Sequence, residues 1–120
     1  MMKVNIDNIG ELAIVECEGR IVQSEAAFKL RDALTSRSDA RTVVLELTEV
    51  PAIEGGGLGM LIYLQRWARD HGIGLKLFNP SKSVRERLKM VSSLSDFDIP
   101  TLDEMMVLLG RADSRYALAS

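Results

Sequence analysis

Alternating apolar and polar positions open the chain. Val4 and Ile6 alternate with polar neighbours, and the segment 12–18 follows the same period towards its end. A period of two is typical of strands with one buried face. The stretch 8–11 between the two segments has the composition of a tight turn. The pattern therefore predicts a β-hairpin that ends at Gly19.

Four later segments have the spacing of amphipathic helices. Their predicted starts are an N-cap at Ser24, then Leu58, Ser81 and Thr101. The second is expected to run from about Leu58 to His71, with Gly72 as its C-cap. The fourth starts with a capping box, because a glutamate stands three residues after Thr101. Its predicted inward positions are Leu102, Met105, Met106 and Leu109.

Short β-branched or apolar runs separate these helices. The segments 42–47 and 74–78 read as buried strands, and 97–100 reads as an edge strand because Pro100 cannot donate to a ladder. Strand–helix–strand units favour parallel strands joined by right-handed crossovers. We therefore predict an α/β fold in ββαβαβαβα order, with a mixed, mostly parallel sheet of four to five strands and about four helices. The domain is expected over 1–110, followed by a frayed tail over 111–120.

Composition narrows the function classes. The chain has 120 residues, 47% of them apolar, which suits one domain with a core of its own. Its net charge of −2 argues against a surface for nucleic acid or anionic membranes. No stretch has the length of a signal peptide or membrane span, so we expect a cytoplasmic protein. Cys17 is the lone cysteine and is expected to be a small buried apolar residue.

The most informative stretch is the run of three glycines at 55–57, between the third strand and the second helix. Consecutive glycines give up much backbone entropy on folding, which indicates special backbone angles or a surface that something approaches closely. The run also follows a parallel strand, where open α/β sheets bind ligands. It lacks the lysine of a phosphate-binding loop, and Glu54 would repel a phosphate. A tight turn without any ligand remains an alternative.

The second helix carries more apolar surface than is needed to cover one face of a sheet. At 100° per residue, one set of side chains can face the sheet, and a second set carries apolar surface to another face. The first set is Leu58, Leu61, Ile62 and Ala68, and the second is Met60, Tyr63, Leu64 and Trp67. Neighbouring helices could cover the second set. Otherwise it would contact a partner or a second copy, with Trp67 as the anchor.

Taken in order, these segments resemble the STAS family of anti-sigma factor antagonists. The resemblance rests on 43–50 (VVLELTEV), 53–59 (IEGGGLG) and 75–80 (LKLFNP), and it spans about 3–110. It implies a regulatory, non-enzymatic protein without cofactors. Family members bind a kinase-like anti-sigma factor and release it when a serine in the turn before the second helix is phosphorylated. A phosphate adds about −1.5 to −2 charges to that interface.

This chain departs from the family pattern in that turn. The acidic residue of the family falls on Glu54, and its two serines fall on Gly55 and Gly56. Gly56, at the phosphoacceptor position, has no hydroxyl to phosphorylate. The predicted partner-binding residues are Glu54, Gly55, Gly56, Gly57, Leu58, Met60, Tyr63 and Trp67. The hydroxyls of Ser24, Thr48, Ser81 and Thr101 are expected to form caps and turns instead.

Two other classes of function stay open. The chain could be an accessory or scaffold subunit of a transporter or stress-signalling complex, in which Tyr63 and Trp67 mediate assembly. It could also bind a small anion or nucleotide at the glycine turn. Catalysis is not expected, since His71 is the single histidine and is placed where a helix dipole favours a cation. We predict neither a metal nor a catalytic residue.

Overall fold

The computed structural model describes residues 3–19, 32, 40–53, 57–91 and 97–112. Its strands and helices follow the predicted order. The strands are β1 (Lys3–Ile9), β2 (Leu12–Glu18), β3 (Thr42–Glu49) and β4 (Gly74–Phe78). The helices are α2 (Gly57–Asp70), α3 (Lys82–Val91) and α4 (Leu102–Ala112). The helix predicted from Ser24 falls outside the described residues, apart from the helical Asp32.

The predicted hairpin is confirmed. β1 and β2 pair antiparallel, and Ile9 lies opposite Leu12 across a two-residue turn. Gly10, the first residue of that turn, has a φ of 59°, which suits a type II′ turn with its glycine at this position. This register directs every second side chain of β2 to the core. Ala13, Val15 and Cys17 are consequently buried.

The remaining strands extend the hairpin into one mixed sheet. In the described residues the sheet has four strands in the order β1-β2-β3-β4. β2 pairs parallel with β3, and β3 pairs parallel with β4. In β3, Val43, Val44 and Leu45 are all fully buried, so this central strand is covered on both faces. A continuous apolar run is the pattern expected of such a strand.

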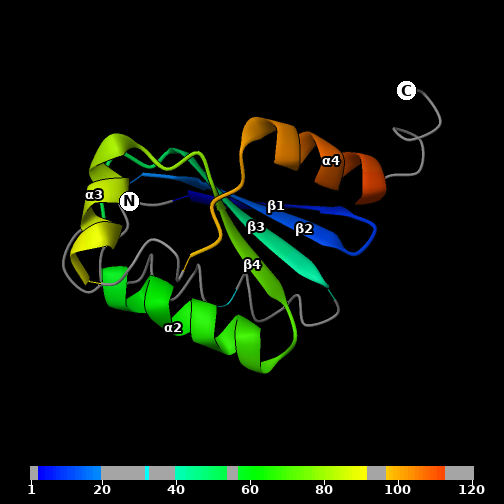
Figure 1. The fold of residues 1–120 in the computed structure, drawn as a ribbon, viewed down its shortest axis with the longest axis horizontal. Helices are drawn as coiled ribbons and strands as arrows, with labels where there is room; N and C mark the ends of the chain where they lie inside the picture. Colours follow the sequence, from blue (N-terminus) through cyan, green and yellow to red (C-terminus); the bar gives the residue numbers. More distant parts are fainter. Residues whose placement is uncertain (1–2, 20–31, 33–39, 54–56, 92–96, 113–120) are drawn as a thin grey trace.

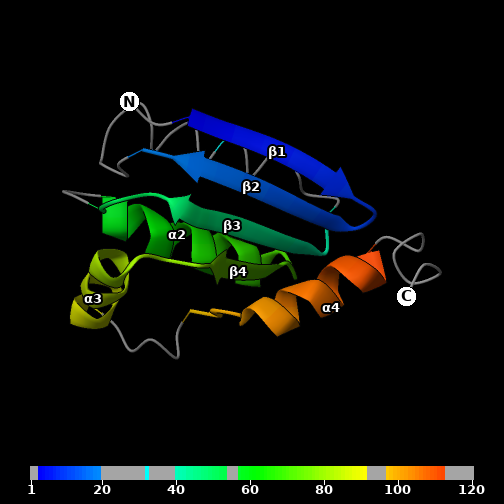
Figure 2. The same cartoon turned by 90° about the horizontal axis from the view of Figure 1, so that it is seen from above.

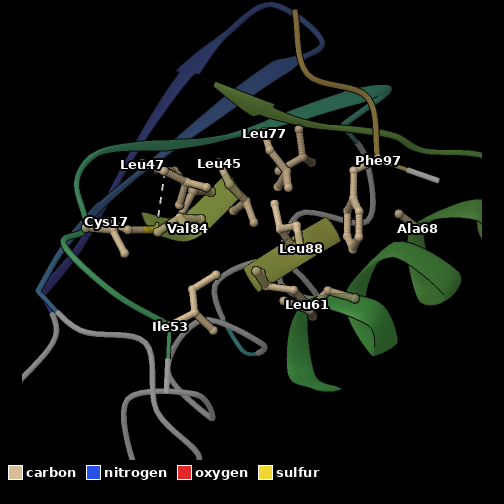
Figure 3. Close-up of a cluster of buried hydrophobic side chains, with 14 of the residues drawn as sticks. Cys17, Leu45, Leu47, Ile53, Leu61, Ala68, Leu77, Val84, Leu88 and Phe97 are labelled. Carbon is tan, nitrogen blue, oxygen red and sulfur yellow. Dashed lines mark hydrogen bonds between the residues drawn. The ribbon is translucent and has the colours of Figure 1, made fainter. Parts of the chain in front are cut away.

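Helices cover the two faces unequally (Figure 1). α2 and α3 pack on the face that carries the main core, where Leu45, Leu61 and Leu88 are fully buried. Figure 3 shows these side chains gathered between the sheet and the two helices. α4 packs on the other face, where Met105 contacts a smaller cluster around Leu12 and Val44. From above, the four strands run side by side, with α2 behind them (Figure 2).

The predicted helix boundaries agree with local hydrogen bonds. Gly72 follows α2 with a φ of 69°, as a C-cap glycine does. The Ser81 hydroxyl accepts a hydrogen bond of 3.2 Å from the Val84 amide at the start of α3. Before α4, Thr101 and Glu104 form the reciprocal bonds of a capping box, at 3.0 and 3.1 Å.

Two predictions about strands and helix faces need correction. The segment 97–100 was predicted as an edge strand but forms an isolated parallel bridge, Asp98 to Lys76, so the sheet of the described residues has four strands, the lower end of the predicted four to five. In α4, Leu102 and Met106 do not face inward, since they are 65% and 60% exposed. The buried side of α4 is instead centred on Met105, with Leu108 and Leu109 partly buried beside it.

Candidate functional site

The predicted site lies where β3 gives way to α2, at the carboxyl ends of the parallel strands. Glu54, Gly55 and Gly56 fall outside the described residues. Gly57 and Leu58 begin α2 and are buried.

The other predicted contact residues follow along α2. Met60 and Trp67 are half-buried against the core, and Tyr63 is 50% exposed. The prediction that Leu64 joins them on a second apolar face is wrong, because Leu64 is fully buried. On a wheel of 100° per residue Leu64 is only about 60° from Leu61, within the arc that faces the sheet.

Aromatic rings line the outer side of α2 at a spacing of four residues. Tyr63, Trp67 and His71 occupy positions i, i+4 and i+8, which bring side chains onto one helix face. The rings of Trp67 and His71 stack, with centroids 4.3 Å apart and an angle of 23° between their planes. His71 Nδ1 also lies 2.8 Å from the carbonyl oxygen of Trp67. The stacking on His71 restricts the position of the Trp67 indole.

A polar network fixes the ends of β3 and β4 beside this turn. The Glu46 carboxylate accepts hydrogen bonds from the Thr48 amide, at 2.8 Å, and from the Thr48 hydroxyl. The Asn79 side-chain amide donates to the same hydroxyl at 3.0 Å. Asn79 has a φ of 53°, a left-handed conformation that asparagine tolerates better than most residues. Thr48 is thus engaged in holding the strand ends, in line with its expected structural role.

Negative charge gathers at the same end of the sheet. On neighbouring parallel strands Glu16 lies beside Glu46, and Glu18 lies beside Glu49. Lys3 lies across the hairpin from Glu18 and is the positive residue in this cross-strand register. Like charges on adjacent strands repel, and a positively charged partner surface would relieve that repulsion.

Gly59 belongs to the 53–59 sequence motif but was not among the predicted partner-binding residues. It lies in the first turn of α2 and is exposed, and its φ is not in the left-handed region. A Cβ built on Gly59 would meet no atom of the described chain within 4 Å. A glycine inside a helix costs about 1 kcal/mol relative to alanine. Within the described residues, no contact requires a glycine here.

Chemistry at other candidate residues is limited by burial. Burial, and then the nearby charge of Glu46, raises the pKa of Cys17 from 9.0 to about 12. Its thiol is thus protonated and enclosed by the core.

Within the described ranges, no three His, Cys, Asp or Glu residues are grouped so that they could hold a metal ion. Nor does any helix in those ranges have the length and apolar character needed to cross a membrane.

A cavity of about 480 Å³ lies beside the C-terminal half of α2, and its lining includes Gln65, Arg69, Ile73 and Asp98. Another cavity lies away from this site. Its volume is about 380 Å³, and its lining includes Gly10, Arg41, Thr42 and Arg111. These residues lie near the amino ends of the parallel strands, where the hairpin turn meets the end of α4. On α2 itself Gly59 and Tyr63 are exposed, and Trp67 is half-buried.

Solved structures share this fold. An anti-sigma factor antagonist from Mycobacterium paratuberculosis matches with a TM-score of 0.73 and 17% identity, over 91% of this chain and 94% of that one. SpoIIAA of Bacillus in its phosphorylated form matches with a TM-score of 0.68 and 13% identity, over 89% and 99%. Identities this low establish the fold alone.

A third structure has the fold within a larger chain. Mglu matches with a TM-score of 0.60 and 26% identity over 67% of this chain, but the match spans only 20% of Mglu. A comparison with curated protein sequences gives no significant match. The sequence model of the STAS domain family matches residues 3–104, which is most of the chain. The sheet order and this match agree, and the chain belongs to the STAS domain family.

Proposed function

We propose that this protein is a cytoplasmic regulatory binding module that docks a kinase-like anti-sigma factor and carries out no catalysis. The docking surface would consist of the turn after β3 and the first three turns of α2, including Gly57, Leu58, Met60, Tyr63 and Trp67. Two observations support this proposal: the family itself, and the shared fold of the Mycobacterium paratuberculosis antagonist.

The observation that carries the proposal is Gly59. An exposed helical glycine destabilises the free protein relative to alanine, and an alanine Cβ here would clash with no atom of the described chain. A glycine at this position would allow the backbone of a partner to approach the helix closely. The fixed indole of Trp67, farther along the same helix, would then act as the anchor of the interface.

The turn also lacks any group that a kinase could modify. No serine, threonine or tyrosine occurs between Thr48 and Tyr63 in the sequence. In the resembling family, a phosphate in this turn ends the interaction through its charge. We therefore propose that the partner stays bound regardless of kinase activity, so that this copy is a constitutive binder or a scaffold subunit.

The experiment compares two alanine variants, Gly59→Ala and Gly110→Ala. Both glycines are helical, and a Cβ added at either would meet no atom of the described chain within 4 Å. Both variants should therefore gain about 0.5–1 kcal/mol in unfolding free energy. Co-purification would first identify the kinase-like ATPase, and calorimetric titration with it would then measure binding. We expect Gly59→Ala to weaken binding at least about tenfold, or 1.4 kcal/mol, and Gly110→Ala to leave it unchanged.

Equal affinity for both variants would contradict the docking surface. Gly56→Asp provides a second test, because it adds a negative charge at the phosphoacceptor position and should also weaken binding. Co-purification with a permease and with no ATPase would favour the accessory or scaffold role instead. Heat released on titration with nucleotides alone would support the ligand-binding alternative.

A further inference from the structure

The two edges of the sheet differ in how they are protected. Beside β4, the bridge between Lys76 and Asp98 covers part of the edge, and the Leu77 amide donates to the Asp98 carbonyl at 2.8 Å. β1 forms the other edge, and no strand of the described residues pairs with its outer side. A seven-residue edge strand with free main-chain groups is a template for pairing with another chain.

The hairpin register determines which main-chain groups face outward. The two-residue turn closes on the pair Ile9 and Leu12, and in an antiparallel ladder hydrogen-bonded and non-hydrogen-bonded pairs alternate. Asn5 and Asp7 therefore bond to β2. The amide and carbonyl groups of Val4 and Ile6 point to the outer edge. The side chains of Val4 and Ile6 are only partly buried against the core, so a neighbouring strand would cover them further.

The sequence of β1 is self-complementary in charge. In an antiparallel pair of two β1 strands centred on Asn5, Lys3 lies opposite Asp7 of the other copy, and Val4 lies opposite Ile6. We propose that β1 pairs with β1 of a second copy in this register, which joins the two sheets across a twofold axis. Both symmetry-related Lys3–Asp7 pairs would be attractive, and the outward groups of Val4 and Ile6 would form the hydrogen bonds.

Other registers are less favourable for a second copy. A shift by two residues in either direction removes the opposite-charge pairs and leaves a charged residue facing Asn5. A shift by four places Asp7 opposite Asp7, or Lys3 opposite Lys3, and like charges directly opposite each other repel. The pattern of charge therefore selects one register. This inference does not depend on the proposed docking of an anti-sigma factor, because β1 contributes none of its residues to that surface.

Charge exchange tests the register. Lys3→Asp and Asp7→Lys each turn two attractive pairs into two repulsive ones, which should weaken self-association on the order of tenfold or more. An equimolar mixture of the two variants restores opposite charges at both pairs and should form heterodimers of the original strength. Sedimentation equilibrium measures all three samples, and circular dichroism verifies that each variant is folded. Wild-type protein that stays monomeric up to its solubility limit would overturn the proposal. So would a mixture that associates no better than its components.

Cross-linking tests the twofold axis separately. In the proposed register the two Asn5 residues form a non-hydrogen-bonded pair with Cα atoms about 4.5 Å apart, within the range of a disulfide. Asn5→Cys should therefore yield a covalent dimer on mild oxidation. Asp7→Cys is the matched control, because its thiol would face Lys3 and not its own copy. The buried Cys17 does not compete. Equal yields from both variants would contradict the register.

Discussion

Cys17 illustrates how the position of a single residue in a strand determines its chemistry. Alternation along β2 predicted an inward side chain, and the thiol is 2% exposed and lies 3.7 Å from the Val15 carbonyl oxygen. Burial is the larger cause of its raised pKa, and the charge of Glu46 is the smaller. Both causes disfavour the thiolate, so the free energy of folding depends on pH where the unfolded thiol loses its proton.

The sign of this dependence follows from the two pKa values. Below pH 9 the thiol is protonated in the folded and unfolded states, so it contributes no pH dependence. Between 9.0 and about 12 only the unfolded state releases the proton, so stability should fall with pH by about 1.4 kcal/mol per unit. Urea unfolding at pH 8 and pH 10 measures this loss, with Cys17→Ala as the control that lacks it. Parallel losses in both proteins would contradict the burial argument.

At the scale of elements, sequence patterns predicted boundaries better than faces. The caps of α2, α3 and α4 follow from local hydrogen bonding and were predicted from single residues such as Gly72 and Ser81. Which side of a helix is buried depends on the tilt and position of the helix over the sheet. Leu64 lies only about 60° from Leu61 on the helical wheel, so the sequence could have placed it on the buried side. Met106 lies about 100° from Met105, at the border of the apolar arc, and the sequence alone could not assign it.

Neighbouring residues of α2 test this assignment. Leu64→Ala should lower the free energy of unfolding by about 2–5 kcal/mol, because it removes a fully buried side chain from the main core. Tyr63→Ala changes a half-exposed side chain next to it and should stay within about 0.5 kcal/mol of the wild type. Chemical denaturation provides both values. A large loss for Tyr63→Ala would mean that its ring packs within the fold and is not available to a partner.

For the whole molecule, the order of elements and the parallel sheet were predictable because each follows from short-range periodicity and from the geometry of crossovers. The extent of strand pairing at 97–100 was not predictable, since a short run can pair over several residues or at one bridge only. The same limit applies to the site. The glycine run predicted a site at the carboxyl end of the sheet, which stays a prediction, and the lack of described atoms around a Cβ at Gly59 became visible only in three dimensions.

The sole tryptophan of the chain provides the most direct test of a docking surface that kinase activity does not switch off. Trp67 is half-buried on α2, so 5-fluorotryptophan at this position gives one ¹⁹F resonance that reports on this helix. We predict that binding of the kinase-like ATPase, once identified by co-purification, shifts this resonance. The shift and the affinity should be the same before and after incubation with Mg-ATP. A resonance that does not change on binding would contradict the proposed docking surface on α2. A resonance that returns to its free position after Mg-ATP treatment, with a phosphate on this chain, would contradict constitutive binding.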